Sequence, residues 1–278
     1  MALVDMDIVA RLMTEVAETE IMPRWRNLAD TDIRAKTGPN DLVTVADEES
    51  EKVLTRRLME ILPGSVVVGE EGVAANPALM DLLGGTDPVW IVDPVDGTSN
   101  FAKGDEKFAV MVALAVADET VASWILEPVT GWTIMAAKGE GAEMLSADGG
   151  RSRLRVAAPV PLGEMAGSFA LRFLPDAVRQ PTRDAATETL GRHYRLGCAG
   201  VEYLKLVTGD AHFAFYWKTM PWDHAPGILI HAEAGGHNAR ATDGRPYRPS
   251  ELHGGLLSAP DAASWLALRA GPVGIAVG

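Results

Sequence analysis

Residues Trp90–Gly104 read WIVDPVDGTSNFAKG, and the rest of the chain is organised around them. The apolar run at the start of this stretch predicts a short buried strand. An abrupt turn is expected next, because Pro94 fixes one φ angle and Gly97 permits a left-handed backbone. Asp93 and Asp96 lie three residues apart on this turn. We therefore expect their carboxylates to point at one place.

Two carboxylates held this close repel each other strongly unless a cation lies between them. His and Cys are absent from this stretch, and an all-oxygen set of ligands favours a hard cation such as Mg²⁺. Thr98 follows directly and offers a hydroxyl group that can orient a water molecule. For such a motif alone, the alternative is an Asx turn in which both carboxylates accept bonds from backbone N–H groups.

The length and composition are those of a globular protein with a sizeable core. The chain has 278 residues, of which 47% are hydrophobic and 23% charged. This length fits two domains or one large unit in two parts. Residues 148–150, Asp-Gly-Gly, are the expected boundary between halves 1–150 and 151–278, because strands precede them and alternating strands and helices follow.

Charge and cysteine content exclude several classes of protein. The formal net charge of −13 argues against nucleic acid as a partner. It also repels an anionic substrate, so a site for one would need bound cations. No apolar run approaches the ~18 residues of a membrane span, and the N-terminus lacks the basic region of a secretory signal. Because Cys198 is the single cysteine, an internal disulfide is excluded, and we expect a cytoplasmic location.

Hydrophobic spacing and turn residues predict the other elements. In the first half we expect helical segments at 5–26, from after 47 to 62 and within 76–87, and strands at 66–68, 89–92, 108–117, 121–126 and 132–137. In the second half we expect strands at 167–173, 193–197, 211–216 and 256–258, and helices at 175–190, 200–208, 221–235 and 261–270. Residues 36–41 and 138–141 are turns by composition.

Other polar residues stand at the ends of these elements. Asp47 has capping-box spacing from Thr44, so it is either a helix-start carboxylate or a functional one. Glu70 and Glu71 end a β-branched strand, and for Glu71 we expect a solvated turn. Asp223 opens a packed helix, where a carboxylate is favoured both as a cap and by the helix dipole. The nearby histidines at 224 and 231 have no partner at ligand spacing, so we expect them to be packing or surface residues.

Together these motifs resemble the inositol monophosphatase family of Mg²⁺-dependent, lithium-sensitive phosphatases. The matching segments follow the family order from about residue 36 to residue 236: Asp41–Thr44 with Asp47, Gly69–Glu71, Asp93–Phe101, and Trp222–Gly227 continuing to Glu233–Gly236. The resemblance implies an α+β fold, a layered α/β/α/β/α sandwich of the sugar-phosphatase type, which is usually a homodimer. It also implies a small-molecule phosphate ester as substrate.

The resemblance further implies roles for individual residues. The implied metal ligands, for more than one Mg²⁺ with Mn²⁺ as a substitute, are Glu70, Asp93, the Val95 carbonyl, Asp96 and Asp223. The implied catalytic residues are Asp47, Thr98 and Glu70, with Lys36 nearby. The implied substrate contacts are Asp96, Gly97, Thr98, Gly197, Cys198, Ala199 and Asp223. The implied reaction is direct attack of a metal-activated water on a small polyol or sugar phosphate such as inositol 1-phosphate.

Several alternatives stay open. Tyr216–Lys218, Lys103–Lys107 and Cys198 depart from the inositol-specific pattern, so the substrate could instead be fructose 1,6-bisphosphate, histidinol phosphate or adenosine 3′,5′-bisphosphate. Lys218 either serves a second anionic group or is solvated, and here the solvated interpretation is preferred. A regulatory or scaffolding dimer with a vestigial metal site is the non-enzymatic alternative. A haloacid dehalogenase phosphatase is disfavoured, because its paired aspartates are two residues apart rather than three.

Overall fold

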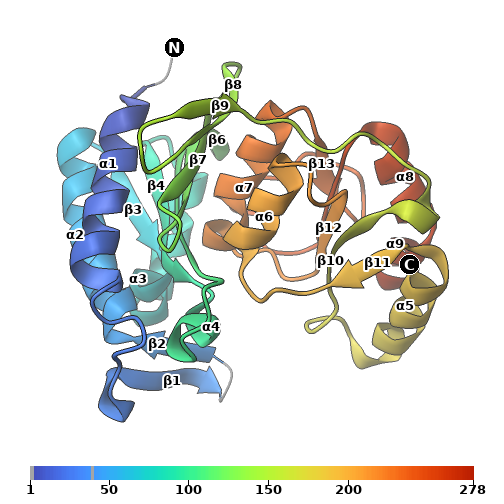
Figure 1. Cartoon of the computed structure of the whole chain (residues 1–278), viewed down its shortest axis with the longest axis horizontal. Helices are drawn as coiled ribbons and strands as arrows, with labels where there is room; N and C mark the ends of the chain where they lie inside the picture. Colours follow the sequence, from blue (N-terminus) through green and yellow to red (C-terminus); the bar gives the residue numbers. More distant parts are fainter. Residues whose placement is uncertain (1–2, 39–40) are drawn as a thin grey trace.

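The computed structural model describes residues 3–38 and 41–278, and within them the chain forms five layers (Figure 1). The first layer contains helices α1 (Met6–Val16) and α2 (Val45–Ile61), and it covers a seven-stranded sheet. Helices α6 (Ala199–Val207) and α7 (Pro221–Glu233) lie between this sheet and a five-stranded sheet. Helices α5 (Asp176–Thr189), α8 (Ala262–Ala270) and α9 (Pro272–Val277) cover the far side. The α+β sandwich expected from the sequence is confirmed.

The seven-stranded sheet has the order β3-β4-β5-β6-β7-β8-β9, in which β3 and β4 are parallel and the other pairs are antiparallel. Its strands are β3 (Val66–Gly69), β4 (Val89–Asp96), β5 (Ala109–Val116), β6 (Glu119–Glu127), β7 (Trp132–Ala137), β8 (Gly141–Leu145) and β9 (Arg151–Arg153). A separate hairpin pairs β1 (Ile33–Gly38) with β2 (Asp41–Thr44). The sheet thus ends at Arg153, just past the expected boundary at 148–150.

The five-stranded sheet has the order β11-β10-β12-β14-β13. Its strands are β10 (Ala166–Ala170), β11 (Arg192–Tyr194), β12 (Phe213–Tyr216), β13 (His237–Arg240) and β14 (Leu256–Ala259). Strands β11, β10 and β12 are parallel to one another, whereas β14 and β13 run antiparallel. The shorter helical segments are η1 (Ala17–Ile21), η2 (Asp30–Asp32), α3 (Glu70–Ala75), η3 (Pro77–Gly84), α4 (Thr98–Ala102) and η4 (Leu162–Glu164).

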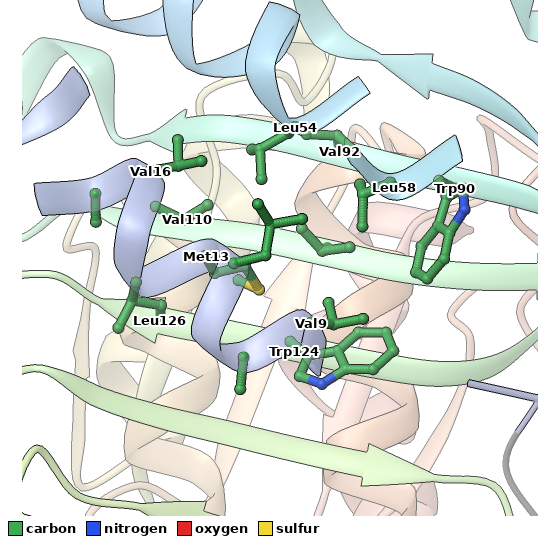
Figure 2. Close-up of a cluster of buried hydrophobic side chains, with 14 of the residues drawn as sticks. Val9, Met13, Val16, Leu54, Leu58, Trp90, Val92, Val110, Trp124 and Leu126 are labelled. Atoms are coloured by element: carbon green, nitrogen blue, oxygen red, sulfur yellow. The ribbon is translucent and has the colours of Figure 1, made fainter. Parts of the chain in front are cut away.

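Both faces of the seven-stranded sheet are buried at its central strands, such as β4 and β5. Figure 2 shows the face towards α1 and α2, where Trp90 and Trp124 pack with aliphatic side chains such as Leu58. Alternate residues of β5 and β6 face the opposite layer, where Met111 and Ile125 pack with side chains of α6 and α7. Burial on both faces explains why β5 is a continuous apolar run rather than an alternating one.

The structure corrects several expected boundaries. A helix is expected over 5–26, but the helical segments there end at Ile21. Pro23 follows two residues later and has no N–H group to donate to a helical bond. The strand expected at 89–92 continues to Asp96. The strand expected at 167–173 ends at Ala170. Of the expected turn at 36–41, residues 36–38 belong to strand β1 and residue 41 begins β2, whereas 39–40 lie outside the described residues. Strands β8, β9 and β13 and helix α9 were not expected from the sequence.

The capping box at the start of α2 is confirmed, because the Thr44 hydroxyl accepts a bond from the Ala46 N–H and the Asp47 carboxylate accepts one from the Thr44 N–H. No helix within the described ranges is both long enough and apolar enough to span a lipid bilayer.

Candidate active site

A β-bulge in β4 turns Asp93 and Asp96 towards the same side of the sheet. Asp93 pairs with Met111 of β5 and Asp96 pairs with Ala109, so three steps along β4 match two steps along β5. In a regular strand, residues three apart face opposite sides, and the extra residue of a bulge removes this difference. Pro94 lies inside the bulge, where the ladder needs no N–H donor. The two carboxylates therefore converge as the sequence predicts, on a bulged strand rather than on a free turn.

Helix α7 adds a third carboxylate to this pair. Asp223 lies in the first turn of α7, where the helix dipole favours a negative charge. Its side chain does not cap the helix, so the capping alternative raised by the sequence does not hold in the structure. One carboxylate oxygen each from Asp93, Asp96 and Asp223 lies within 4.8 Å of the others. Two halves of the chain thus supply one cluster of acidic oxygens.

The cluster is unfavourable when it carries no cation. Burial raises the pKa of Asp93 well above its usual range, and the charges of Glu70 and Asp96 raise it further. Burial also raises the pKa of Asp223 well above its usual range, with Asp96 adding to the effect. The pKa of Asp96 rises to about 6 because of burial. Carboxylate oxygens that repel one another in this way are suitable ligands for a hard divalent cation, because each carboxylate would be attracted to the cation.

Asp47 and Thr98 form a hydrogen-bonded pair beside the cluster. The Thr98 hydroxyl lies 3.1 Å from Asp47 Oδ1 and 3.1 Å from the Val95 carbonyl oxygen, so it can donate its proton to either. The other oxygen of Asp47 accepts bonds from the N–H and the hydroxyl of Thr44. Burial raises the pKa of Asp47 to about 6, although the bonds from Thr44 lower it. Asp47 is therefore both a helix cap and a partner of Thr98.

Glu70 stands apart from the three clustered aspartates. It is the first residue of α3, and its carboxylate accepts a bond from Lys36 Nζ at 2.8 Å. Lys36 also donates to Glu71 at 2.6 Å, which leaves the Glu71 side chain only 12% exposed. The expected solvated turn at Glu71 is therefore wrong, because α3 starts here and Lys36 covers the carboxylate. Burial tends to lower the pKa of Lys36, but the charges of Glu70 and Glu71 outweigh it and raise the pKa above its ordinary value.

A buried carboxylate that the sequence did not single out holds the start of α3. Glu51 of α2 accepts bonds from the N–H groups of Glu71 at 2.8 Å and Gly72 at 2.6 Å. The close approach depends on Gly69, where a Cβ atom would lie 2.3 Å from the Glu51 carboxyl carbon. Glu51 thereby fixes the segment that carries Glu70. In the sequence Glu51 lies within an ordinary helical pattern, so the sequence did not predict this role.

The segment Gly197–Ala199 lies against Asp96. The Cys198 thiol donates to Asp96 Oδ2 at 3.0 Å, and the Gly200 N–H donates to the same oxygen at 2.6 Å. Gly197, Cys198 and Ala199 also line a cavity next to the acidic cluster. The thiol is thus engaged with a carboxylate, and burial together with the charge of Asp96 raises its pKa well above its ordinary value.

Two adjoining cavities meet at Asp96 and Asp223. The larger, of about 340 Å³, is lined by Glu70, Asp93 and the α4 start at Gly97 and Thr98. The smaller, of about 160 Å³, reaches towards the five-stranded sheet. Basic residues that sequence reasoning did not assign to the site also line these cavities: Lys103, Arg172 and Arg195. Nothing in the local sequence marks the last two, because only the strand order of the five-stranded sheet brings them together.

The two histidines of α7 are packing residues, and the surface alternative does not hold. His224 and His231 are both fully enclosed, and burial lowers the pKa of each to about 4. The Nε2 atom of His224 lies 3.1 Å from the Lys218 carbonyl oxygen, to which it must donate. Its Nδ1 atom then accepts from the Tyr203 hydroxyl at 3.2 Å. His224 thereby fixes the backbone at Lys218, beside the cavity.

Known proteins share this fold and sequence pattern. The model of the inositol monophosphatase family matches residues 3–269. An inositol-1-monophosphatase of Mycobacterium leprae is 33% identical over 205 residues, which are 73% of this chain and 69% of the relative. A fructose-1,6-bisphosphatase/inositol-1-monophosphatase of Thermotoga maritima is 27% identical over 83% of this chain and 82% of the relative. The solved structure of a Thermotoga maritima IMPase superposes with a TM-score of 0.79 at 23% identity, covering 98% of both chains.

The chain therefore belongs to the inositol monophosphatase family, and it is an enzyme of the phosphoric monoester hydrolase class. The resemblance recognised in the sequence is confirmed. The family acts on small phosphate esters, and in this chain the acidic cluster of Asp93, Asp96 and Asp223 could hold a metal ion.

Proposed function

We propose that this protein is a Mg²⁺-dependent phosphomonoesterase that hydrolyses a small polyol or sugar phosphate by direct attack of water. The observation that carries the proposal is the convergence of Asp93, Asp96 and Asp223 beside the bonded pair of Thr98 and Asp47. Carboxylates suit the metal ions that bind phosphate oxygens, and the paired hydroxyl and carboxylate suit a water molecule that must lose a proton.

The proposed metal ligands are the three clustered aspartates, the carboxylate of Glu70 and the carbonyl oxygen of Val95. Glu70 is bonded to Lys36, whose positive charge stabilises it while no cation is bound. The Val95 oxygen lies within hydrogen-bond distance of the Thr98 hydroxyl. When bound, Mg²⁺ or Mn²⁺ supplies Lewis acidity that polarises the phosphate, lowers the pKa of water and stabilises the leaving alkoxide.

The protein's own residues orient and deprotonate the nucleophile in this proposal. Thr98 accepts a hydrogen bond from the water and donates its own proton to Asp47 Oδ1. With a pKa raised to about 6 by burial, Asp47 is ionised at neutral pH yet basic enough to receive a proton. Gly97 and Thr98 line the cavity at the start of α4, where backbone amides would contact the phosphate. A covalent phosphoenzyme is not needed.

The two halves of the chain divide these tasks. Residues 1–150 supply Asp47, Glu70, Asp93, Asp96 and Thr98, whereas residues 151–278 supply Asp223 and the cavity wall at Gly197–Ala199. We further propose that the enzyme acts as a cytoplasmic homodimer and that lithium inhibits it, as the family resemblance implies.

Phosphate release from a panel of substrates tests the proposal. The panel contains inositol 1-phosphate, fructose 1,6-bisphosphate, histidinol phosphate, adenosine 3′,5′-bisphosphate and glycerol 2-phosphate, each with Mg²⁺ and with a chelator. We expect chelator-sensitive release, and the order of kcat/KM names the substrate class. Release that is unchanged by the chelator would contradict the proposed metal chemistry. No release from any compound by folded, Mg²⁺-treated protein would contradict the proposed substrate class.

A further inference from the structure

Three neighbouring strands of the five-stranded sheet each end beside a basic residue. Strands β11, β10 and β12 are adjacent and parallel, so their carboxyl ends meet at one edge of the sheet. Arg195 follows β11 directly, and Arg172 and Lys218 lie two residues beyond the ends of β10 and β12. Ligands of open sheets characteristically bind at the carboxyl ends of parallel strands. The topology therefore gathers three cations where a ligand is expected.

All three cations line the smaller cavity. Arg172 and Arg195 also line the larger cavity with the acidic cluster, so they stand where the two cavities join. Lys218 lines the smaller of these two cavities but not the larger. Any ligand that places one group among the clustered carboxylates can thus extend towards these three side chains.

An exposed aromatic ring holds two of the cations close together. The Arg172 guanidinium carbon lies 5.0 Å and the Lys218 ammonium nitrogen 5.3 Å from the centroid of the Phe173 ring. Phe173 is 48% exposed and also lines the smaller cavity. Contact with an aromatic face stabilises each cation, but two cations at one ring still repel each other. An anion between them would remove that repulsion.

None of these three exposed residues forms an ion pair among the side chains that the structure describes, although the charge of Lys218 opposes the rise in the pKa of Asp223 that burial causes. The ion pairs there involve other basic residues, including arginines at 24, 57, 151, 240 and 245. The chain has 38 acidic and 25 basic residues, so three neighbouring basic side chains that form no ion pair among the described residues are unusual for its composition. Glu202 lines the same cavity, but its carboxylate accepts a bond from the Leu196 N–H at 2.7 Å.

We propose that the smaller cavity binds a second anionic group of the substrate, a phosphate or a carboxylate, and that Arg172, Arg195 and Lys218 hold it. This inference rests on the proposed function, because the hydrolysed phosphate occupies the neighbouring acidic site. The planar fork of arginine matches the oxygens of both groups, and lysine adds a point charge. A neutral polyol would place no negative charge between these cations. Lys218 is exposed, as the solvated interpretation from the sequence expected, and the proposal adds a ligand-binding role for it.

Binding of matched pairs of compounds tests the inference separately from turnover. One pair is 2-phosphoglycerate and glycerol 2-phosphate, which differ by a carboxylate. The other is fructose 1,6-bisphosphate and fructose 1-phosphate, which differ by a phosphate. Dissociation constants are measured by calorimetry on the whole protein with Ca²⁺ in place of Mg²⁺ to slow turnover. We expect the compound with the second anion to bind about tenfold tighter or more in at least one pair, and the pair identifies the group.

Variants that remove one positive charge from the cavity then test whether the cavity causes the preference for the compound with a second anion. In Lys218→Gln and Arg172→Gln the ratio of dissociation constants within the preferred pair should fall about tenfold, because losses common to both compounds cancel in the ratio. Lys138→Gln is the control, since it removes the same charge from a surface lysine paired with Glu119. It should leave the ratio unchanged.

The possible results separate the two proposals. Equal affinities within both pairs, or a ratio that survives both variants, would overturn the second-anion inference even if phosphate release is normal. Chelator-insensitive or absent release with an intact preference would instead contradict the proposed function alone.

Discussion

Replacing Asp93 by asparagine should move activity and stability in opposite directions. The two side chains have the same shape, and asparagine Oδ1 can still accept the bond that the Val95 N–H now donates to Asp93 Oδ1 at 3.1 Å. The fold around the bulge should therefore persist. The variant loses one negative charge in a cluster where burial and neighbouring charges already raise the pKa of Asp93 well above its usual range.

The geometry sets the size of the stability change. The clustered oxygens lie within 4.8 Å of one another, and at an effective dielectric constant of about 20 two unit charges at that distance repel by about 3.5 kcal/mol. Partial protonation relieves some of this repulsion. We therefore expect metal-free Asp93→Asn to be more stable than the wild type by about 1–3 kcal/mol at pH 8, where each kcal/mol raises Tm by about 2–4 °C.

Turnover should fall at least about 10³-fold, because the variant lacks a ligand to a metal that supplies several kcal/mol of transition-state stabilisation. The assay is thermal unfolding with a chelator and with Mg²⁺, combined with phosphate release. Asp81→Asn is the matched control, because Asp81 is exposed, and it should change neither quantity. A rate within tenfold of wild type at saturating Mg²⁺ would refute the ligand assignment. A metal-free Tm below that of the wild type would refute the repulsion argument.

Three further outcomes are expected. Asp47→Asn should lower kcat by about 10²–10⁴-fold but shift the midpoint of Mg²⁺ activation little, because Asp47 is not one of the three clustered carboxylates. The measurement is an Mg²⁺ titration of activity at saturating substrate. A large shift of the Mg²⁺ midpoint with little change in kcat would contradict the proposed role of Asp47. Glu51→Ala should destabilise the protein to urea by about 2–4 kcal/mol and raise the Mg²⁺ midpoint, since two partly buried N–H groups next to Glu70 lose a charged acceptor. A change below about 1 kcal/mol would contradict this. The rise in Tm caused by Mg²⁺ should grow from about pH 5 to about pH 7. The pKa of Asp96 is about 6 in the metal-free fold against an ordinary 3.8, so this group's contribution to metal-free stability falls as pH rises from about 4 to about 6, while the ion needs the ionised form, which predominates above pH 6. The two buried histidines contribute equally to stability with and without Mg²⁺, so their titration does not affect the rise in Tm that Mg²⁺ causes. A rise in Tm that stays constant or shrinks as pH increases would count against the carboxylate site.

Helices and strands could be predicted from the local sequence pattern where that pattern agrees with the tertiary structure. The helical spacing after Pro221, with a glycine stop, predicted α7 and placed Asp223 in its first turn. Strand β9 reads Arg-Ser-Arg and is fully exposed, so no alternation of apolar residues marks it. Helix α9 is only six residues long and contains Gly274, so neither its length nor its composition predicts a helix in isolation. Such elements form because neighbouring elements pack or pair with them.

The convergence of the site was partly visible in the sequence and partly not. The spacing of Asp93 and Asp96 predicted that they would meet, but the cause is a bulge whose register depends on pairing with β5. The cations at 172 and 195 gave no such signal, and Lys218 suggested a second anionic group only as the less preferred alternative. They are isolated in the sequence, and only the strand order β11-β10-β12 brings them to one edge. Sequence spacing reports local geometry, whereas this part of the site is produced by topology.

The structural and functional interpretations of Asp47 are compatible, because they use different oxygens. Oδ2 accepts the N–H and hydroxyl bonds from Thr44, which closes the start of α2. Oδ1 is left to face Thr98. The cap restricts the carboxylate to one orientation, and its bonds lower a pKa that burial alone would raise further. A proton acceptor needs both a fixed position and a pKa close to the working pH. A helix cap supplies both here, so evidence for the structural role of Asp47 supports its proposed role in catalysis.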